Sequence, residues 1–130
     1  MVEVEDGFVR EISGGSEADR FREAVEAGAS RARQFVKEGK LPRSALGAYV
    51  KNSKNLGELG IGMNRAARIV GNVLEDEKVF RTCHIAIGSN YDDDAPALIH
   101  YDGIINEPTI VATMPGGSKK MLLDRGELKV

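Results

Sequence analysis

The chain has 130 residues, of which 42% are hydrophobic and 29% charged, a composition typical of globular proteins that argues against global disorder. Lysine and arginine number 18 against 20 aspartates and glutamates, a net charge of -2. That balance argues against a nucleic-acid-binding surface, because such surfaces carry a basic excess. The length predicts a single domain spanning residues 1–130.

The cellular setting is indicated by what the sequence lacks. A single cysteine, Cys83, allows neither an intramolecular disulfide nor a thiolate metal cluster, which is typical of a reducing compartment. The segment MVEVEDGFVREI has no basic stretch followed by an apolar one, so no signal peptide is expected. No window approaches the roughly 20 apolar residues that span a bilayer. We therefore expect a cytoplasmic protein that binds neither nucleic acid nor membrane.

The first part of the chain predicts a hairpin and two helices. Apolar residues on both sides of Asp6-Gly7 predict a β-hairpin with a tight turn. Ser16 follows two glycines and is a good N-cap for a helix that ends at Gly39. Pro42 opens a second, short helix, RSALGAYVKN. Both helices have apolar residues at helical spacing and are expected to be amphipathic.

The second part predicts strands. Short apolar runs alternate with turn residues, and Gly116-Gly117 and Arg125-Gly126 are typical of hairpin turns. The stretch NRAARIVGNVLEDEKVF has a mixed character and is expected to be partly helical. The predicted fold class is α+β, with two early amphipathic helices and a largely antiparallel, twisted or barrel-like sheet in the second half.

Both histidines of the chain lie on predicted strands. His100 and Asp102 are two residues apart, so their side chains project from the same face of a strand. An imidazole beside a carboxylate is half of a metal shell, although the same pair also forms ordinary surface hydrogen bonds. His84 begins the run HIAIG.

The candidate carboxylates are open to more than one interpretation. Glu58 lies in the apolar run LGELGIG, where a buried charge requires either a cation or a lysine or arginine partner. Glu77 and the two acids before it also fit a solvated helix face, and the run 92–94 of aspartates fits a wet loop. Arg65 and Arg68 either bind a substrate carboxylate or are surface charges, and we favour the surface. Two histidines and several carboxylates suit zinc, cobalt or manganese better than a redox cluster.

Four segments of the sequence indicate a more specific interpretation of these candidate ligands. In order, LGELGIGMN, GNVLEDEK, HIAIGSNY and HYDGII resemble the metal-site segments of the aminopeptidase T and aminopeptidase S family, the thermophilic-type leucyl aminopeptidases. The resemblance runs from DGFVREISGG to DRGELKV and is most specific in residues 56–103. It implies that the chain is the C-terminal metal-binding part of a larger enzyme. One further glutamate ligand of the family lies upstream of the matching region and has no counterpart here.

The resemblance also implies roles for single residues. By position, Glu58, His84, His100 and Asp102 correspond to metal ligands, and Tyr91 to an active-site tyrosine. Glu77 matches an acidic residue proposed as a ligand or as the catalytic carboxylate, and we assign it as general base. Tyr91 would stabilise the oxyanion. The implied cofactor is a pair of divalent ions, zinc or cobalt, with manganese or magnesium as alternatives.

The implied function is that of an aminopeptidase that removes N-terminal residues such as leucine from a peptide substrate. One alternative is a mononuclear Fe(II) ring-cleaving dioxygenase, since relatives of the family have that activity. Another is a non-catalytic remnant of the fold that associates with itself, because a separated half of an enzyme exposes apolar surface. Whichever of these functions the chain has, we expect it to form a homo-oligomer, a dimer or larger.

Overall fold

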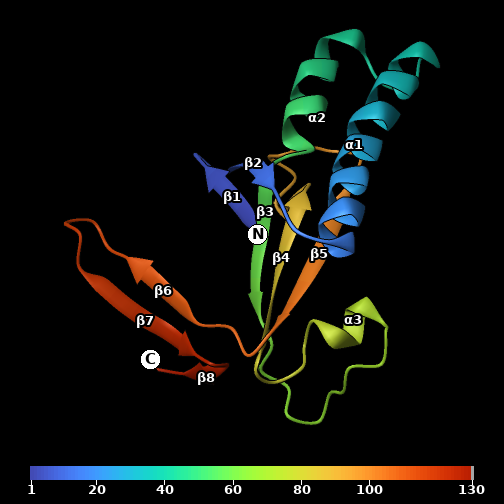
Figure 1. The fold of residues 1–130 in the computed structure, drawn as a ribbon. Helices are drawn as coiled ribbons and strands as arrows, with labels where there is room; N and C mark the ends of the chain where they lie inside the picture. The colour runs from blue at the N-terminus through green and yellow to red at the C-terminus, as the bar shows by residue number, and fades with distance from the viewer. Residues whose placement is uncertain (130) are drawn as a thin grey trace. The chain divides into compact units, whose positions relative to one another are not determined.

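The computed structural model describes residues 1–129, and Figure 1 shows the arrangement of its helices and strands. Strands predominate, and helices account for 28% of the chain. In chain order the elements are β1 (Val2–Glu5), β2 (Phe8–Ile12), α1 (Ser16–Lys37), the 3₁₀ helix η1 (Arg43–Ala45), α2 (Leu46–Asn52), β3 (Leu56–Ile61), α3 (Val73–Asp76), β4 (Thr82–Gly88), β5 (His100–Asn106), β6 (Ile110–Thr113), β7 (Lys119–Asp124) and β8 (Glu127–Leu128).

The strands form three small sheets, with the orders β1-β2, β3-β4-β5 and β6-β7-β8. The predicted fold class is therefore wrong, because within residues 1–129 the strands of the second half are divided between small sheets and do not form one large twisted or barrel-like sheet. The short helix α3 lies in the stretch that was expected to be partly helical. Between β5 and β6, Glu107 has a φ of 48° and Pro108 lacks a backbone N–H. Both features interrupt a hydrogen-bonded ladder, so pairing begins again in a separate sheet.

The hairpin turns lie where the sequence predicts them. Asp6 and Gly7 have φ angles of 51° and 77°, and Arg125 and Gly126 have 47° and 76°. Two successive positive φ values match the primed turn that fits the twist of paired strands. Gly116 and Gly117 form the third turn, between β6 and β7, with φ angles of 96° and 85°. Local turn chemistry therefore determines all three reversals.

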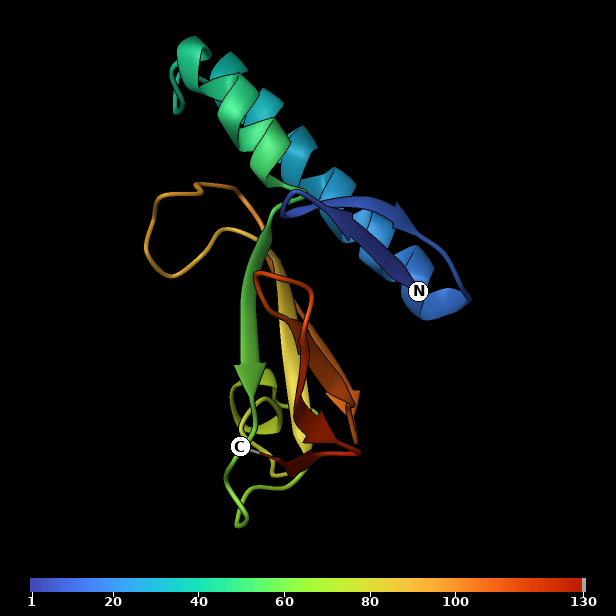
Figure 2. The same cartoon turned by 90° about the vertical axis from the view of Figure 1, so that its left-hand side faces the viewer.

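The long helix α1 begins at Ser16, but its N-cap is Gly15, which has no side chain to cap with. The predicted cap at Ser16 is thus displaced by one residue. Val25, Gly28 and Ala32 are buried at helical spacing along α1. The second predicted helix is divided into η1 and the seven-residue α2, and neither of them buries a residue. Figure 2 shows α1 and α2 side by side, with the β1-β2 hairpin next to α1. No helix within residues 1–129 is both long and apolar enough to cross a membrane.

The chain divides into two compact units. Unit 1 comprises Met1–Glu58 and Ala86–Asp102, and unit 2 comprises Leu59–Ile85 and Gly103–Val130. The division passes through β3, β4 and β5, so each of these strands contributes residues to both units. The core of unit 1 includes Val9, Val25, Ala32, Ala86 and Ile87, and that of unit 2 includes Ala67, Cys83 and Leu123. Burial raises the pKa of the Cys83 thiol.

Candidate functional site

The six residues singled out from the sequence lie on or beside the strands of the β3-β4-β5 sheet or close to α3. Unit 1 contains Glu58 on β3, Tyr91 between β4 and β5, and His100 and Asp102 on β5; unit 2 contains Glu77, which follows α3, and His84 on β4. Each unit therefore carries its own group of potential ligands.

The group in unit 1 is formed by Glu58, His100 and Asp102. The Nε2 atom of His100 lies 3.4 Å from Oδ1 of Asp102 and 3.8 Å from Oε2 of Glu58. His100 and Asp102 approach each other because residues two apart on a strand share a face. The side chain of Asp102 is 12% exposed, whereas those of His100 and Glu58 are 38% and 40% exposed. One side of the group is thus sheltered and the other is open to solvent.

The imidazole of His100 is oriented by a second contact on its other nitrogen. Its Nδ1 atom lies 2.8 Å from the carbonyl oxygen of Ser89. A carbonyl oxygen only accepts hydrogen bonds, so Nδ1 carries the proton and donates it. In the neutral ring, Nε2 then presents its lone pair toward Asp102 and Glu58. This is the tautomer and orientation that metal-binding histidines receive from a backbone carbonyl.

The Oδ1 atom of Asp102 fits a bound cation. It is buried, and within residues 1–129 it receives no hydrogen bond. In the neutral tautomer, two lone-pair atoms, Nε2 of His100 and Oδ1 of Asp102, face each other at 3.4 Å. A cation between them relieves this repulsion, either a proton on Nε2 or a metal ion. Ligand atoms held at about 2.1 Å from one ion are about 3 to 3.5 Å apart, so the observed separation suits shared ligation.

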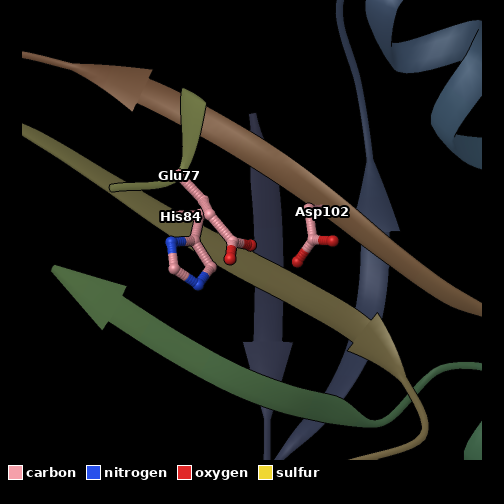
Figure 3. Close-up of side chains that lie close together, drawn as sticks. All are labelled: Glu77, His84 and Asp102. Carbon is pink, nitrogen blue, oxygen red and sulfur yellow. The ribbon is translucent and has the colours of Figure 1, made fainter. Parts of the chain in front are cut away.

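The group in unit 2 consists of Glu77 and His84. Their ligand atoms lie within 4.8 Å of each other, and Figure 3 draws both side chains together with Asp102 of β5. His84 is 4% exposed, whereas the side chain of Glu77 is 14% exposed and forms an ion pair with Lys78 at 2.6 Å. A sheltered carboxylate beside an imidazole is suited to ligation or to accepting a proton.

The position of His84 depends on a glycine. A Cβ added at Gly60, on β3, would overlap the imidazole ring of His84. A Cβ added at Gly62, which follows β3 in the same run, would overlap the carbonyl oxygen of Val79 and Oγ1 of Thr82, the first residue of β4. The run LGELGIG therefore has glycines where β4 and its preceding turn approach β3 closely. Gly60 and Gly62 are therefore candidates for residues that determine the position of His84 and of the start of β4.

Other residues considered from the sequence have structural surroundings. Tyr91 is 93% exposed. Arg65 lies over the ring of Phe80 at 3.9 Å, and Arg68 donates to the backbone carbonyls of Arg65 and Ala67. Both arginines are therefore part of the local structure of their loop, which agrees with the surface interpretation. The aspartates at 92–94 are exposed, as expected for a wet loop.

Asp76 differs from the expected solvated helix face. It is buried, and its two carboxylate oxygens accept hydrogen bonds from the backbone of Val70 at 2.8 Å and Gly71 at 3.1 Å. The carboxylate thus satisfies two backbone donors of the loop before α3, where side-chain oxygens commonly take this role. Its role is to order this loop, so it is not a candidate ligand.

Sequence reasoning missed the residues that orient the ligands. Ser89 contributes a backbone oxygen, and nothing in its side chain indicates a contact with His100. Gly60 could have been found from the sequence, since glycines recur at 57 and 60 in β3 and at 62 just after it, and glycines in a strand are unfavourable without a close neighbour. The resemblance to the aminopeptidase T family remains a prediction from the sequence. No protein-family model, no curated protein and no solved structure matches the chain.

Proposed function

We propose that this chain is the metal-binding part of a metal-dependent aminopeptidase, a hydrolase that removes N-terminal residues from peptides. The observation that carries the proposal is the orientation of His100, whose Nδ1 lies 2.8 Å from the Ser89 carbonyl while Nε2 is directed at Asp102 and Glu58. That arrangement supports a divalent ion in unit 1. The ordered sequence segments that resemble the aminopeptidase T family supply the reaction class.

The donor atoms favour zinc or cobalt, with manganese or magnesium as alternatives. Unit 1 offers one imidazole nitrogen and two carboxylate groups, a set without sulfur that suits borderline and hard divalent ions. The group also favours a hydrolase over an Fe(II) dioxygenase. Mononuclear Fe(II) oxygenases use two histidines and one carboxylate, whereas Glu58, His100 and Asp102 include a single histidine.

When bound, the metal supplies Lewis acidity that activates water for attack on a peptide carbonyl. In this proposal Glu58, His100 and Asp102 of unit 1 hold one ion, and His84 of unit 2 is a ligand of a second ion. Glu77 of unit 2 is assigned as the general base, because its carboxylate is sheltered and adjacent to the imidazole of His84. The exposed hydroxyl of Tyr91 donates a hydrogen bond to the developing oxyanion once substrate is bound.

The proposal is tested by titrating the metal-stripped protein with zinc and cobalt, using calorimetry for stoichiometry and visible absorbance for cobalt geometry. We expect two ions per wild-type chain. His100→Gln should lose the ion of unit 1 and His84→Gln that of unit 2, each with an affinity loss of at least about 100-fold, since even outer-shell substitutions cost 10- to 100-fold. Asp92→Asn, in the exposed aspartate loop, is the matched control and should bind as wild type does.

Activity is then measured with leucyl-p-nitroanilide on the loaded protein. Hydrolysis that is lost in Glu77→Gln while both ions remain bound would support Glu77 as the base. An equal and weak affinity for metal in wild type, His100→Gln and Asp92→Asn would overturn the proposal, because the ions would then bind only to scattered surface acids. Metal binding without hydrolysis of any N-terminal amide would retain the site and reject the reaction.

A further inference from the structure

A cavity of about 430 Å³ in unit 1 lies between one stripe of α1 and the segment that leads into β5. The stripe consists of Ala24, Ala27, Gly28 and Arg31, whose spacing of three and four residues places them on one face of the helix. The first three have small side chains or none and leave the space unfilled. Arg31, at the end of the stripe, introduces a permanent positive charge.

The opposite wall contains the residues that orient the candidate ligand His100. Ser89 and His100 both line the cavity. The backbone N–H of Ser89 donates to the carbonyl of Ile99 at 2.8 Å, and Gly28 is so close that an added Cβ would lie 2.6 Å from Cγ2 of Ile99. The wall is thus fixed by backbone hydrogen bonding and by contact with α1. Binding pockets are usually preformed in this way.

The charge of the cavity selects an anion. Its lining contains no aspartate or glutamate, and Arg31 is the one lysine or arginine in it. Within the part of the chain that the structure describes, Arg31 forms no ion pair and no side-chain hydrogen bond. Its guanidinium is therefore available for a ligand, and its planar fork of donors matches a carboxylate.

We infer that this cavity binds a short peptide by its C-terminal carboxylate, with the carboxylate at Arg31 and the reacting end of the peptide beside His100. Arg31 and His100 line the same cavity of about 430 Å³, so a peptide that reaches both residues has to be short. The preferred substrates are therefore di- and tripeptides with small or apolar side chains. This inference rests on the proposed function, because it places the reacting end of the peptide at a metal ligand.

A carboxylate on an acidic side chain has the same chemistry as a terminal carboxylate. The small, apolar stripe on α1 accommodates a peptide backbone better than a branched acidic side chain, so we assign the site to the terminus. Three probes distinguish a terminal carboxylate from an acidic side chain. They are leucylglycylglycine, its C-terminal amide, and leucylaspartylamide, which carries its carboxylate on the side chain.

Binding of the three probes is measured by calorimetry on the metal-stripped protein, so that the readout does not depend on catalysis. We expect the free acid to bind up to about fivefold more tightly than its amide, the gain of one solvent-accessible bidentate ion pair at the exposed Arg31. Arg31→Gln should abolish this difference, and Arg31→Lys should retain part of it. Arg33→Gln is the matched control, because Arg33 lies on α1 outside the cavity lining and should leave the preference unchanged.

Equal binding of acid and amide by the wild-type protein, or no binding of either, would overturn the inference, as would an undiminished preference in folded Arg31→Gln. Tighter binding of leucylaspartylamide than of the free acid would reassign the site to acidic side chains. Failure of the proposed function alone would give a different result. Leucylglycylglycine would still bind more tightly than its amide, but the protein would bind no metal and would hydrolyse none of the three probes.

Discussion

His100 donates its Nδ1 proton to the backbone carbonyl of Ser89, which lies 2.8 Å away. The contact leaves Nε2 as the ligand atom without requiring any other side chain. Because the acceptor is a main-chain oxygen, the orientation of the ring depends on the path of the loop after β4 rather than on the identity of residue 89. Substitutions of Ser89 are therefore expected to leave the ring in place.

The tautomer of His100 is directly measurable. In the neutral ring of the metal-free protein, we expect the proton to lie on Nδ1, because the Ser89 carbonyl accepts a hydrogen bond from that atom. Long-range nitrogen–proton correlation spectra of labelled imidazoles distinguish the two neutral forms. Ser89→Ala should give the same spectrum, since it preserves the carbonyl. Observation of the Nε2-protonated form would contradict the assignment of Nε2 as a ligand.

Gly60→Ala should displace His84. The added methyl group would overlap the imidazole ring, and we expect a loss of about 1 to 3 kcal/mol in the free energy of unfolding. The matched control is Gly47→Ala, because Gly47 has nothing within 4 Å of an added Cβ and lies in α2, where alanine is favoured by up to about 1 kcal/mol. Chemical denaturation of both variants provides the comparison. A Gly60→Ala protein as stable as wild type would show that the ring does not pack on this glycine.

Asp76→Asn should loosen the loop before α3. The new amide group would turn a donor toward one of the two backbone N–H groups that the carboxylate satisfies, and the expected cost is about 1 to 3 kcal/mol. Unfolding measurements give the cost, and limited proteolysis reports whether cleavage becomes faster between residues 62 and 76. Asp92→Asn, on an exposed loop, should change stability by less than about 0.5 kcal/mol. Equal stability of the two variants would argue that Asp76 does not order this loop.

Cys83 should react slowly with thiol reagents while the protein is folded. Its side chain is 2% exposed and burial raises the pKa of its thiol, so both access and thiolate content are reduced. We expect at least about a 100-fold slower reaction with a chromogenic disulfide than in guanidinium chloride, where the chain is unfolded. A rapid, stoichiometric reaction of the native protein would mean that β4 is accessible, and the same assay would then have to be repeated with metal bound.

The sequence predicts those parts of the structure that depend on neighbouring residues. The turns at Asp6-Gly7 and Arg125-Gly126, the course of α1, and the proximity of His100 to Asp102 all follow from local conformation or from the two-residue period of a strand. Local patterns do not specify which strands pair. The expected single sheet was wrong for that reason, since alternation of apolar and polar residues identifies a strand but not its partner.

In the candidate site, too, the sequence predicts contacts between near neighbours in the chain but not contacts between distant residues. His100 and Asp102 were identifiable as a pair, whereas the contact of His100 with Ser89 joins residues 11 apart through a backbone atom. Arg31 was not singled out, because an arginine on an amphipathic helix is ordinarily a solvated charge. Its significance arises only when the segment leading into β5 closes a cavity against the same stripe of α1.

The closeness of Gly60 to His84 also provides a built-in reporter. The glycine hydrogen that occupies the Cβ direction points at the imidazole ring, so the ring current of His84 separates the chemical shifts of the two Gly60 α-protons. Any rotation of the ring, on metal loading or on substrate binding, changes that separation. A single glycine resonance pair thus records the orientation of a buried histidine in the unmodified protein, with every candidate ligand left intact.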